Sequence, residues 1–181
     1  MADKERDLCP LVIDLSSGFT KVGFGGEDIP RISFPSLLAF QQEKREKNDI
    51  NQNAQDEIKV LVGNDALTHE YEKNHYSSLS FPIRNGMVTN LDHLDHMFLH
   101  MFDHYKINVL ASLEQQPSML IYKYVLTLQL VLLTEACENA PENRYQIAEL
   151  LFEKYKVNKL YFARQPALDM FSTGRTTGLV L

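Results

Sequence analysis

The N-terminal part of the chain shows the pattern of short β-strands separated by tight turns. Residues 11–14 form an apolar run that ends in an acid, and residues 19–24 alternate apolar and polar positions with the period of two typical of a half-buried strand. Residues 16–18, Ser-Ser-Gly, have turn chemistry. We therefore expect a β-hairpin, and then a further strand over residues 29–34 that Pro35 closes.

A long polar stretch follows. Residues 41–57 read QQEKREKNDINQNAQDE and show no hydrophobic periodicity, which predicts a solvated loop or a disordered segment; a segment that docks a partner is the less favoured alternative. Residues 58–62 predict a short strand, and Gly63 begins a turn into a short helix. Residues 71–80 are polar and predict irregular structure.

The second half of the chain mixes helical and strand patterns. Apolar residues recur at helical spacing from a cap at Asn90 or Asp92 to about residue 105, and a second helix is expected over residues 141–155. The remaining predicted elements are strands over residues 128–134, 160–162 and 177–181, and a helix over residues 165–171 that ends at Gly174. Strands mixed with helices indicate the α/β class.

Composition narrows the function classes. The chain has 181 residues, of which 44% are hydrophobic and 23% charged, as in an ordinary globular protein with one sizeable domain or two small ones. The formal net charge of −6 argues against direct binding of nucleic acid, which needs a basic face. It leaves ATP open, because one lysine and a few backbone N–H groups suffice to hold a phosphate tail.

Three features of the sequence bear on where the protein is located. Residues 119–133 are the most apolar run, but they are shorter than the roughly 20 residues of a membrane span and contain Lys123, so we expect a buried strand or strand pair and no membrane partner. The charged N-terminus predicts no signal peptide. Cys9 and Cys137 fit two thiols in the cytoplasm or nucleus, with a single disulfide as the alternative.

Histidines recur along the predicted helix that begins near Asn90. His93, His96, His100 and His104 fall near one side of it at spacings of three and four residues. Pairs at this spacing could chelate Zn²⁺ or Ni²⁺. The favoured interpretation is a partly exposed polar flank beside the apolar stripe.

Residues 11–21, LVIDLSSGFTK, contain the groups that a polyphosphate needs. Gly18 permits close approach of the backbone, Ser17 offers a hydroxyl, and Lys21 supplies a positive charge one turn away. Asp14, at the end of the strand, is suitably placed to bind Mg²⁺ through water. A strand follows this turn, whereas a helix follows a Walker loop or a dinucleotide fingerprint. By pattern alone, an ordinary hairpin turn is the favoured interpretation, and a phosphate turn is the alternative.

Four blocks of the sequence, in order, resemble actins and actin-related proteins. The first is LVIDLSSGFTKVGFGGEDIPRISFPS; the others are FPIRNGMVTNLDHLDHMF (81–98), VLLTEACENAPENRYQIAELLFEKYKV (131–157) and LYFARQPALDMFSTGRTTGLVL (160–181). The chain is identified as a divergent member of this family over residues 1–181. The resemblance implies an α/β fold, the first lobe of the actin/Hsp70/sugar-kinase (ribonuclease H-like) type, with a mixed sheet flanked by helices and truncated before the second lobe.

The resemblance also implies residue roles. Asp14 is expected to hold the Mg²⁺ of ATP through water, Ser17 to contact the terminal phosphate, and Lys21 to reach the β- and γ-phosphates. Gln165 is expected to orient the water that attacks the γ-phosphorus, as the catalytic residue of phosphoryl transfer. Three further residues complete the expected cofactor-binding set: Ser16, Gly18 and Phe19.

The chain departs from the family in several places. Ser16 replaces a glycine, and its side chain is expected to crowd the phosphate loop. Residues 41–80 form a variant loop region that resembles the small subdomain of the family and replaces its mobile loop. Residues 118–130 look like an insertion or a retained intron. The family's second phosphate loop would follow the last residues, GLVL, so only half of the phosphate clamp is expected.

The implied function is that of an actin-like or actin-related subunit in an ATP-linked cytoskeletal filament or complex. ATP or ADP with Mg²⁺ would be the cofactor, bound weakly here, with at most a weak ATPase activity. Other actin-like subunits or actin-binding proteins would be the partners, in the cytoplasm and cytoskeleton or in the nucleus. Two alternatives remain: a non-catalytic structural subunit of a larger cytoskeletal or chromatin complex, and a truncated product without independent function.

Overall fold

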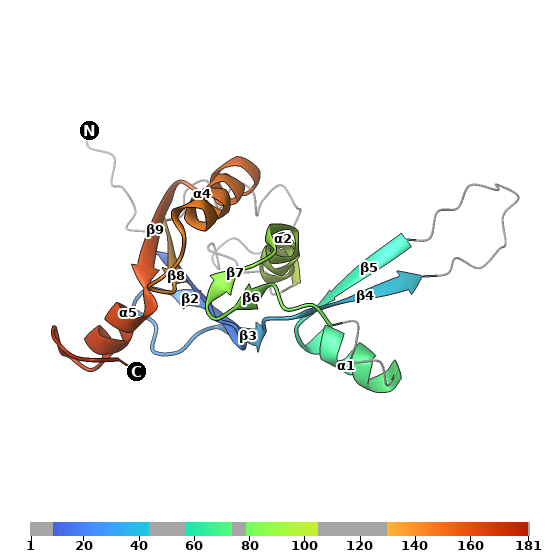
Figure 1. Ribbon diagram of the computed structural model, residues 1–181, viewed down its shortest axis with the longest axis horizontal. Coiled ribbons are helices and arrows are strands. Elements are labelled where there is room, and N and C mark those ends of the chain that lie inside the picture. Colours follow the sequence, from blue (N-terminus) through green and yellow to red (C-terminus); the bar gives the residue numbers. More distant parts are fainter. Residues whose placement is uncertain (1–8, 44–56, 74–78, 105–129, 181) are drawn as a thin grey trace, which may run out of the picture.

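The centre of the fold is a five-stranded mixed sheet. The computed structural model describes residues 9–43, 57–73, 79–104 and 130–180. The sheet has the order β3-β2-β1-β8-β9, in which β1, β2 and β3 pair antiparallel while β8 runs parallel to both β1 and β9 (Figure 1). This arrangement confirms the α/β class and the predicted hairpin. The strands are β1 (Leu11–Leu15), β2 (Phe19–Phe24), β3 (Ile32–Pro35), β8 (Leu130–Glu135) and β9 (Lys159–Arg164).

Two helices cover one face of this sheet. Helix α2 (Leu91–Leu99) begins at Asn90, whose Oδ1 accepts a hydrogen bond from the backbone N–H of His93 at 3.0 Å, as an N-cap does. Helix α4 (Pro141–Glu149) begins with proline, which lacks the N–H that a first helical turn leaves unpaired. Both helices continue into π-helical turns, His100–His104 after α2 and Leu150–Lys154 after α4.

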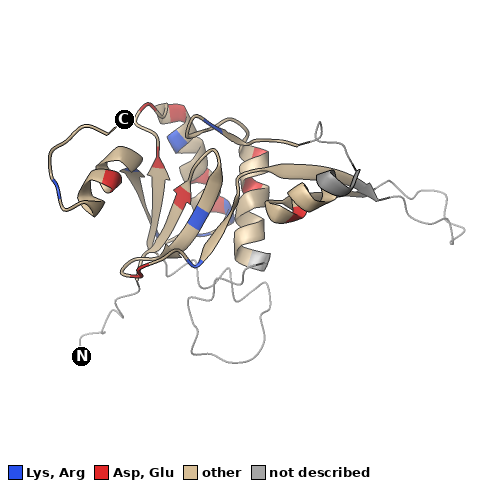
Figure 2. Ribbon diagram, turned by 90° about the horizontal axis from the view of Figure 1, so that it is seen from below, with Lys and Arg blue, Asp and Glu red and all other residues tan. Residues whose placement is uncertain are grey.

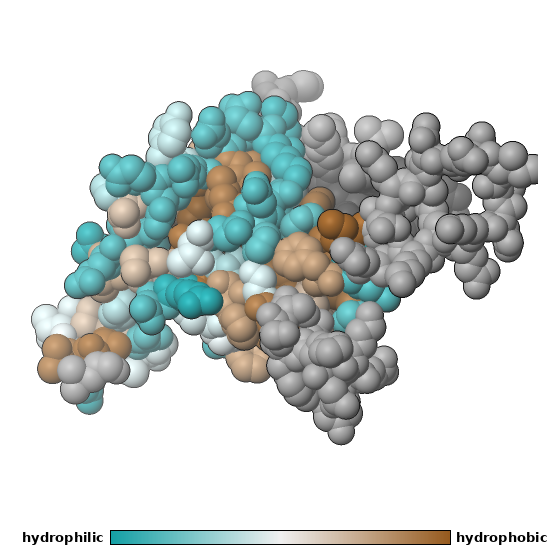
Figure 3. Space-filling model, turned by 45° about the vertical axis from the view of Figure 1, so that its right-hand side comes forward, coloured by the Kyte–Doolittle hydropathy of each residue, from teal (hydrophilic) through white to brown (hydrophobic). Residues whose placement is uncertain are grey.

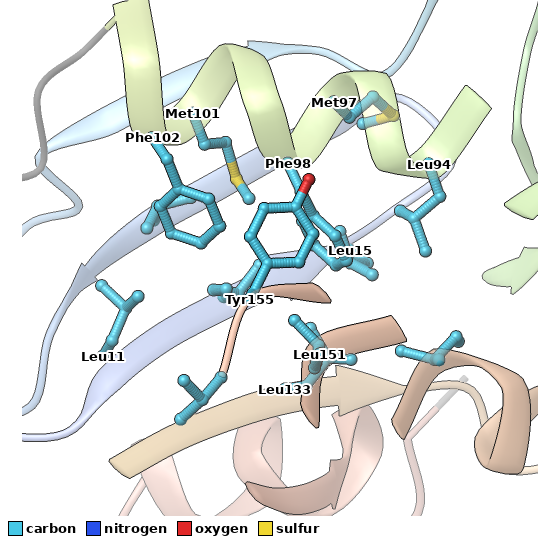
Figure 4. Packing of buried hydrophobic residues seen from close by; sticks show 14 of the residues in the cluster. Leu11, Leu15, Leu94, Met97, Phe98, Met101, Phe102, Leu133, Leu151 and Tyr155 are labelled. Carbon is cyan, nitrogen blue, oxygen red and sulfur yellow. The ribbon is translucent and has the colours of Figure 1, made fainter. Parts of the chain in front are cut away.

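The core lies between the sheet and these helices. Leu11, Ile13 and Leu15 alternate along β1 toward the helices and are at most 3% exposed, because every second side chain of a strand faces the same way. In Figure 4 the ring of Tyr155 lies between α2 and the strands. Its hydroxyl donates to the Asp95 carboxylate at 2.8 Å, so an aromatic ring is buried while its polar end is satisfied.

The π-helical turn after α4 positions this tyrosine. The backbone N–H of Tyr155 donates to the carbonyl of Leu150, five residues earlier, at 3.4 Å. The ring then meets Phe98 edge to face, with centroids 5.7 Å apart and planes at 82°. The turn thus orients Tyr155, at the end of the helix, toward α2.

A two-stranded ribbon and one helix extend from the sheet. Strand β4 (Leu38–Glu43) pairs antiparallel with β5 (Glu57–Val62), and α1 (Asn64–Lys73) follows (Figure 1). The predicted solvated segment 41–57 was therefore wrong at both ends, because residues 41–43 and 57 belong to these strands. Backbone pairing extends the ribbon beyond its apolar part; residues 44–56 lie outside the described residues.

A second hairpin was not predicted. Strands β6 (Ile83–Arg84) and β7 (Met87–Val88) are joined by Asn85 and Gly86, with φ of 53° and 72°. Positive φ at both positions is what a tight two-residue hairpin turn requires, and an Asn-Gly pair is the residue signal for it. The hairpin brings Gly86 close to the β1–β2 turn.

Other boundaries also differ from expectation. Strand β3 begins at Ile32 rather than at residue 29, and α1 continues to Lys73 into the segment predicted to be irregular. Residues 177–180 form no strand, since no neighbouring strand pairs with them in the described part of the chain. Most of the apolar run 119–133 and the predicted insertion 118–130 lie outside the described residues, and Leu130 already begins β8.

The surface of the described part is mixed in charge. Figure 2 shows acidic and basic residues interspersed over helices, strands and turns. On the face in Figure 3, an apolar strip is bordered by hydrophilic residues. Among the helices described, none has the length and apolar character needed to cross a membrane.

Truncation of the aromatic core should destabilise the fold strongly. We expect Phe98→Ala to lower the free energy of unfolding by about 3–5 kcal/mol, because Phe98 is fully buried and its ring packs on Tyr155. Urea denaturation followed by circular dichroism measures this. Phe152→Ala is the matched control, since Phe152 is 39% exposed; equal losses in the two variants would contradict the assigned core.

Candidate phosphate-binding site

The turn between β1 and β2 is fixed by contacts from two other segments. The carbonyl of Gly18 accepts from the backbone N–H of Ser36 at 2.9 Å, and Ser17 Oγ accepts from the backbone N–H of Gly86 at 2.9 Å. Below the turn, the buried hydroxyls of Thr20 and Ser36 lie 2.8 Å apart. The turn is therefore anchored at its base and on one side.

Space lies open beside Gly18. A Cβ built on this residue would meet no heavy atom within 4 Å, apart from those of its chain neighbours. Ser17 and Gly18 are both exposed, and the Phe19 side chain is 52% exposed at the start of β2. A ligand can thus approach this backbone closely.

Asp14 and Lys21 form a cross-strand pair next to this turn. They are directly opposed in the β1–β2 register, and Lys21 Nζ lies 3.8 Å from Asp14 Oδ2. The Lys21 side chain is 50% exposed and that of Asp14 is 28% exposed, so both reach solvent. Together they line a cleft of about 370 Å³ that is bounded by residues 25–30.

The other oxygen of Asp14 belongs to a polar network at the strand ends. Asp14 Oδ1 accepts from Thr134 Oγ1 at 2.7 Å and from Gln165 Nε2 at 3.1 Å. Thr134 Oγ1 in turn accepts from the backbone N–H of Leu15 at 3.1 Å. Because β1, β8 and β9 are parallel, their carboxyl ends meet at one edge of the sheet, and this network connects all three.

Gln165 lies at the centre of this network. It is the first residue of α5 (Gln165–Ser172), directly after β9. Its Nε2 lies 3.1–3.3 Å from four oxygen atoms, which belong to Asp14, Leu15, Ser16 and Thr134. An amide nitrogen carries only two hydrogens, so these protein oxygens can accept both of them.

Ser16 points into the same network. Its hydroxyl lies 3.4 Å from Asp14 Oδ1 and 3.3 Å from Gln165 Nε2. The structure therefore places this side chain toward Asp14 and Gln165, while the neighbouring Ser17 and Gly18 are the exposed residues of the turn.

An ion pair between a buried glutamate and a partly exposed arginine supports the strand that carries Thr134. Glu135 is 5% exposed, and its carboxylate binds the Arg144 guanidinium through two nitrogens, one bond being Nε to Oε2 at 3.1 Å. Asn139 Nδ2 donates to Glu135 Oε2 at 3.0 Å. Burial alone would raise the pKa of Glu135, but the hydrogen bonds from Arg144 and Asn139 outweigh it and lower the pKa below the usual value.

Six of the predicted site residues thus gather at one edge of the sheet. Asp14, Ser16, Ser17, Gly18 and Lys21 lie on the hairpin, and Gln165 joins them from 144 residues beyond Lys21. Phe19 follows the turn with an exposed ring. The arrangement offers an open glycine turn, one cation and one carboxylate, which is a donor set suited to a phosphate–Mg²⁺ group.

Thr134 and Gly86 were missed in the sequence. The signal for Thr134 was a lone hydroxyl at the end of the apolar run 131–133, and the signal for Gly86 was the Asn-Gly pair. Neither signal says which distant segment the residue contacts. Their roles here are to hold Asp14 and Ser17 in place.

The histidines do not gather around a metal position in the described residues. There, no group of three or more His, Cys, Asp or Glu side chains could hold an ion. His93 Nδ1 instead lies 2.7 Å from Ser80 Oγ, and the His100 ring packs edge-on against Phe34 with centroids 5.2 Å apart. The side chain of His104 lies outside the described part.

Removing the Thr134 hydroxyl should weaken the fold. We expect Thr134→Val to lower the free energy of unfolding by about 1–3 kcal/mol, because the buried Leu15 N–H loses its acceptor and Asp14 loses a donor. Urea denaturation measures this. Thr173→Val is the control, since Thr173 lies on the exposed end of α5; a Thr134→Val loss no larger than that of the control would count against the network.

The Glu135 ion pair should make stability depend on pH in the acid range. Because the folded-state pKa of Glu135 is lowered, its contribution is fully present above its unfolded pKa of about 4.5 and is lost as the pH falls through the folded value. We expect wild type to exceed Glu135→Gln in unfolding free energy at pH 7, and the difference to shrink below pH 4.5. Denaturation at several pH values checks this; a difference that stays constant with pH would refute it.

Comparison with known proteins identifies the family. The family model described as Actin matches residues 6–181. Actin-related protein 4 of Arabidopsis thaliana is 32% identical over 192 aligned residues, which cover 97% of this chain and 39% of the relative. The chain therefore spans about two fifths of that relative's length.

The mixed sheet with its flanking helices agrees with one lobe of the actin fold. The family match covers nearly the whole chain, and the expected resemblance is confirmed. The chain belongs to the actin family, which includes the actin-related proteins.

Proposed function

We propose that this chain provides half of a Mg–ATP site within an actin-related subunit. The observation that carries the proposal is the cross-strand pair of Asp14 and Lys21 beside the open turn at Gly18. A polyphosphate needs a cation and backbone that it can approach closely, and the β1–β2 hairpin carries both. The turn is anchored by Ser36 and Gly86 and so requires little reordering on binding.

Each residue has a distinct role in this proposal. Lys21 neutralises the β- and γ-phosphates, and Ser17 and the backbone at Gly18 face the terminal phosphate. Asp14 Oδ2 is the carboxylate oxygen outside the Thr134–Gln165 network, and it would accept from water on Mg²⁺. Phe19 follows the turn, and its half-exposed ring would border the bound phosphate. Bound Mg²⁺ would supply charge neutralisation for the phosphates.

Hydrolysis would be slow in this arrangement. The amide nitrogen of Gln165 lies within reach of four protein oxygens, so it would have to leave these contacts before it could donate to an attacking water. Its Oε1 lies near the β6–β7 hairpin, 3.7 Å from the position of a Cβ on Gly86. This oxygen is the group of Gln165 that would accept a hydrogen bond from the water.

The occupied Gln165 also favours a second candidate function. A non-catalytic subunit of a larger cytoskeletal or nuclear complex needs a rigid lobe and no turnover, and a glutamine that links the ends of three strands fits that role. Other actin-like subunits or actin-binding proteins would be the partners. Retention in a complex without nucleotide would favour this alternative.

Neutralising Lys21 should weaken nucleotide binding. We expect Lys21→Gln to lower the affinity for Mg–ATP by about tenfold or more, because a charge-assisted contact to phosphate is lost. Isothermal titration of the full chain with Mg–ATP measures this. Lys159→Gln is the matched control, since Lys159 begins β9 at the opposite end of the strand from Gln165.

The outcomes separate the two candidates. Binding by wild type that Lys21→Gln reduces and Lys159→Gln leaves unchanged supports the nucleotide site. No binding by wild type, together with co-purification in a complex, would favour the structural subunit. Equal binding by wild type and Lys21→Gln would exclude the proposed phosphate contact.

A further inference from the structure

A second cation, Arg84, lies on the hairpin beside the phosphate turn. Its backbone belongs to β6, and its exposed side chain makes no hydrogen bond or ion pair with the described residues. We propose that Arg84 binds the terminal phosphate of a nucleoside triphosphate held at the Ser16–Gly18 turn. The inference rests on the proposed nucleotide site and adds a residue that distinguishes triphosphate from diphosphate.

Arg84 and the turn line one open hollow. Its volume is about 550 Å³, and Ser17 from the first hairpin faces Ile83, Arg84 and Asn85 from the second across it. Phe81 also lines it. Because Ser17 belongs to the predicted phosphate turn, a group that enters this hollow meets both that turn and Arg84.

The hairpin that carries Arg84 is held in position. Ile83 is 1% exposed, Gly86 donates to Ser17 Oγ at 2.9 Å, and the N–H of Thr89 donates to the carbonyl of Pro82 at 2.8 Å. A Cβ on Gly86 would lie 3.1 Å from that of Ala136, so the turn packs closely on the end of β8. Arg84 flanks this two-residue turn, and its backbone position relative to Ser17 is therefore fixed.

The local charge balance favours an anion as the ligand. Lys21 Nζ lies 3.8 Å from the Asp14 carboxylate, so Lys21 already faces one negative charge within the protein. Arg84 has no such carboxylate among the described residues. Binding of a triphosphate at the turn brings more negative charge than Lys21 alone can match, and guanidinium binds phosphate oxygens in a bidentate manner.

A titration with two nucleotides tests the assignment. Wild type, Arg84→Gln, Arg84→Lys and the control Lys159→Gln are each titrated with Mg–ATP and with Mg–ADP at two salt concentrations. We expect Arg84→Gln to lower the affinity for Mg–ATP by about tenfold while changing that for Mg–ADP by less than about twofold. Arg84→Lys should recover part of the loss, and the Arg84→Gln effect should be smaller at high salt.

Several outcomes would overturn the inference while the nucleotide site stands. These are unchanged Mg–ATP binding by Arg84→Gln, or an equal loss for Mg–ATP and Mg–ADP. If wild type binds neither nucleotide, the proposed function fails and the role of Arg84 fails with it. Arg84 is exposed, so the melting temperature of each variant should match that of wild type. If Arg84→Gln melts at a lower temperature, the affinities of Arg84→Lys decide the question. Affinities of Arg84→Lys equal to those of wild type for both nucleotides would then count against a bidentate contact.

Discussion

The hydroxyl of Thr134 is the contact on which the arrangement of the site depends. The parallel ladder between β1 and β8 ends at the pair Ile13 and Leu133, so the N–H of Leu15 has no backbone partner on β8. Thr134 Oγ1 accepts from that N–H and donates its own proton to Asp14. A buried N–H without an acceptor would cost free energy comparable to a lost hydrogen bond. One side chain thus ends the ladder and also orients the carboxylate beside the turn.

The same strand end carries a second polar side chain of a different kind. Glu135 follows Thr134 and binds Arg144 on α4. The Arg144 guanidinium also lies over the Phe162 ring of β9, 5.6 Å from its centroid. Thr134 and Glu135 are neighbours on β8, so their side chains point to opposite faces of the sheet. Thr134 connects the end of the strand to Asp14 beside the phosphate turn, and Glu135 connects it to α4.

Local features of the fold could be predicted from the sequence, and long-range ones could not. The period of two and the Ser-Ser-Gly turn indicate the β1–β2 hairpin, and its short connection implies that Asp14 and Lys21 face each other. Residues 41–43 are polar yet form part of β4, because backbone pairing with β5 does not require apolar side chains. The contacts of Thr134 with Leu15 and of Gly86 with Ser17 join residues 119 and 69 positions apart, and no local pattern encodes which residues meet.

The π-helical turn after α4 contains one residue that a regular helix would not need. Its bond from Tyr155 back to Leu150 accommodates one residue more than a regular helix would. Loss of a single residue within this turn would let the helix close with regular winding, and Tyr155 would still face Phe98 and Asp95. In a regular helix the same deletion rotates everything beyond it by roughly 100° about the helix axis. A change of one residue in chain length is therefore tolerated more readily in this turn than in a regular helical segment.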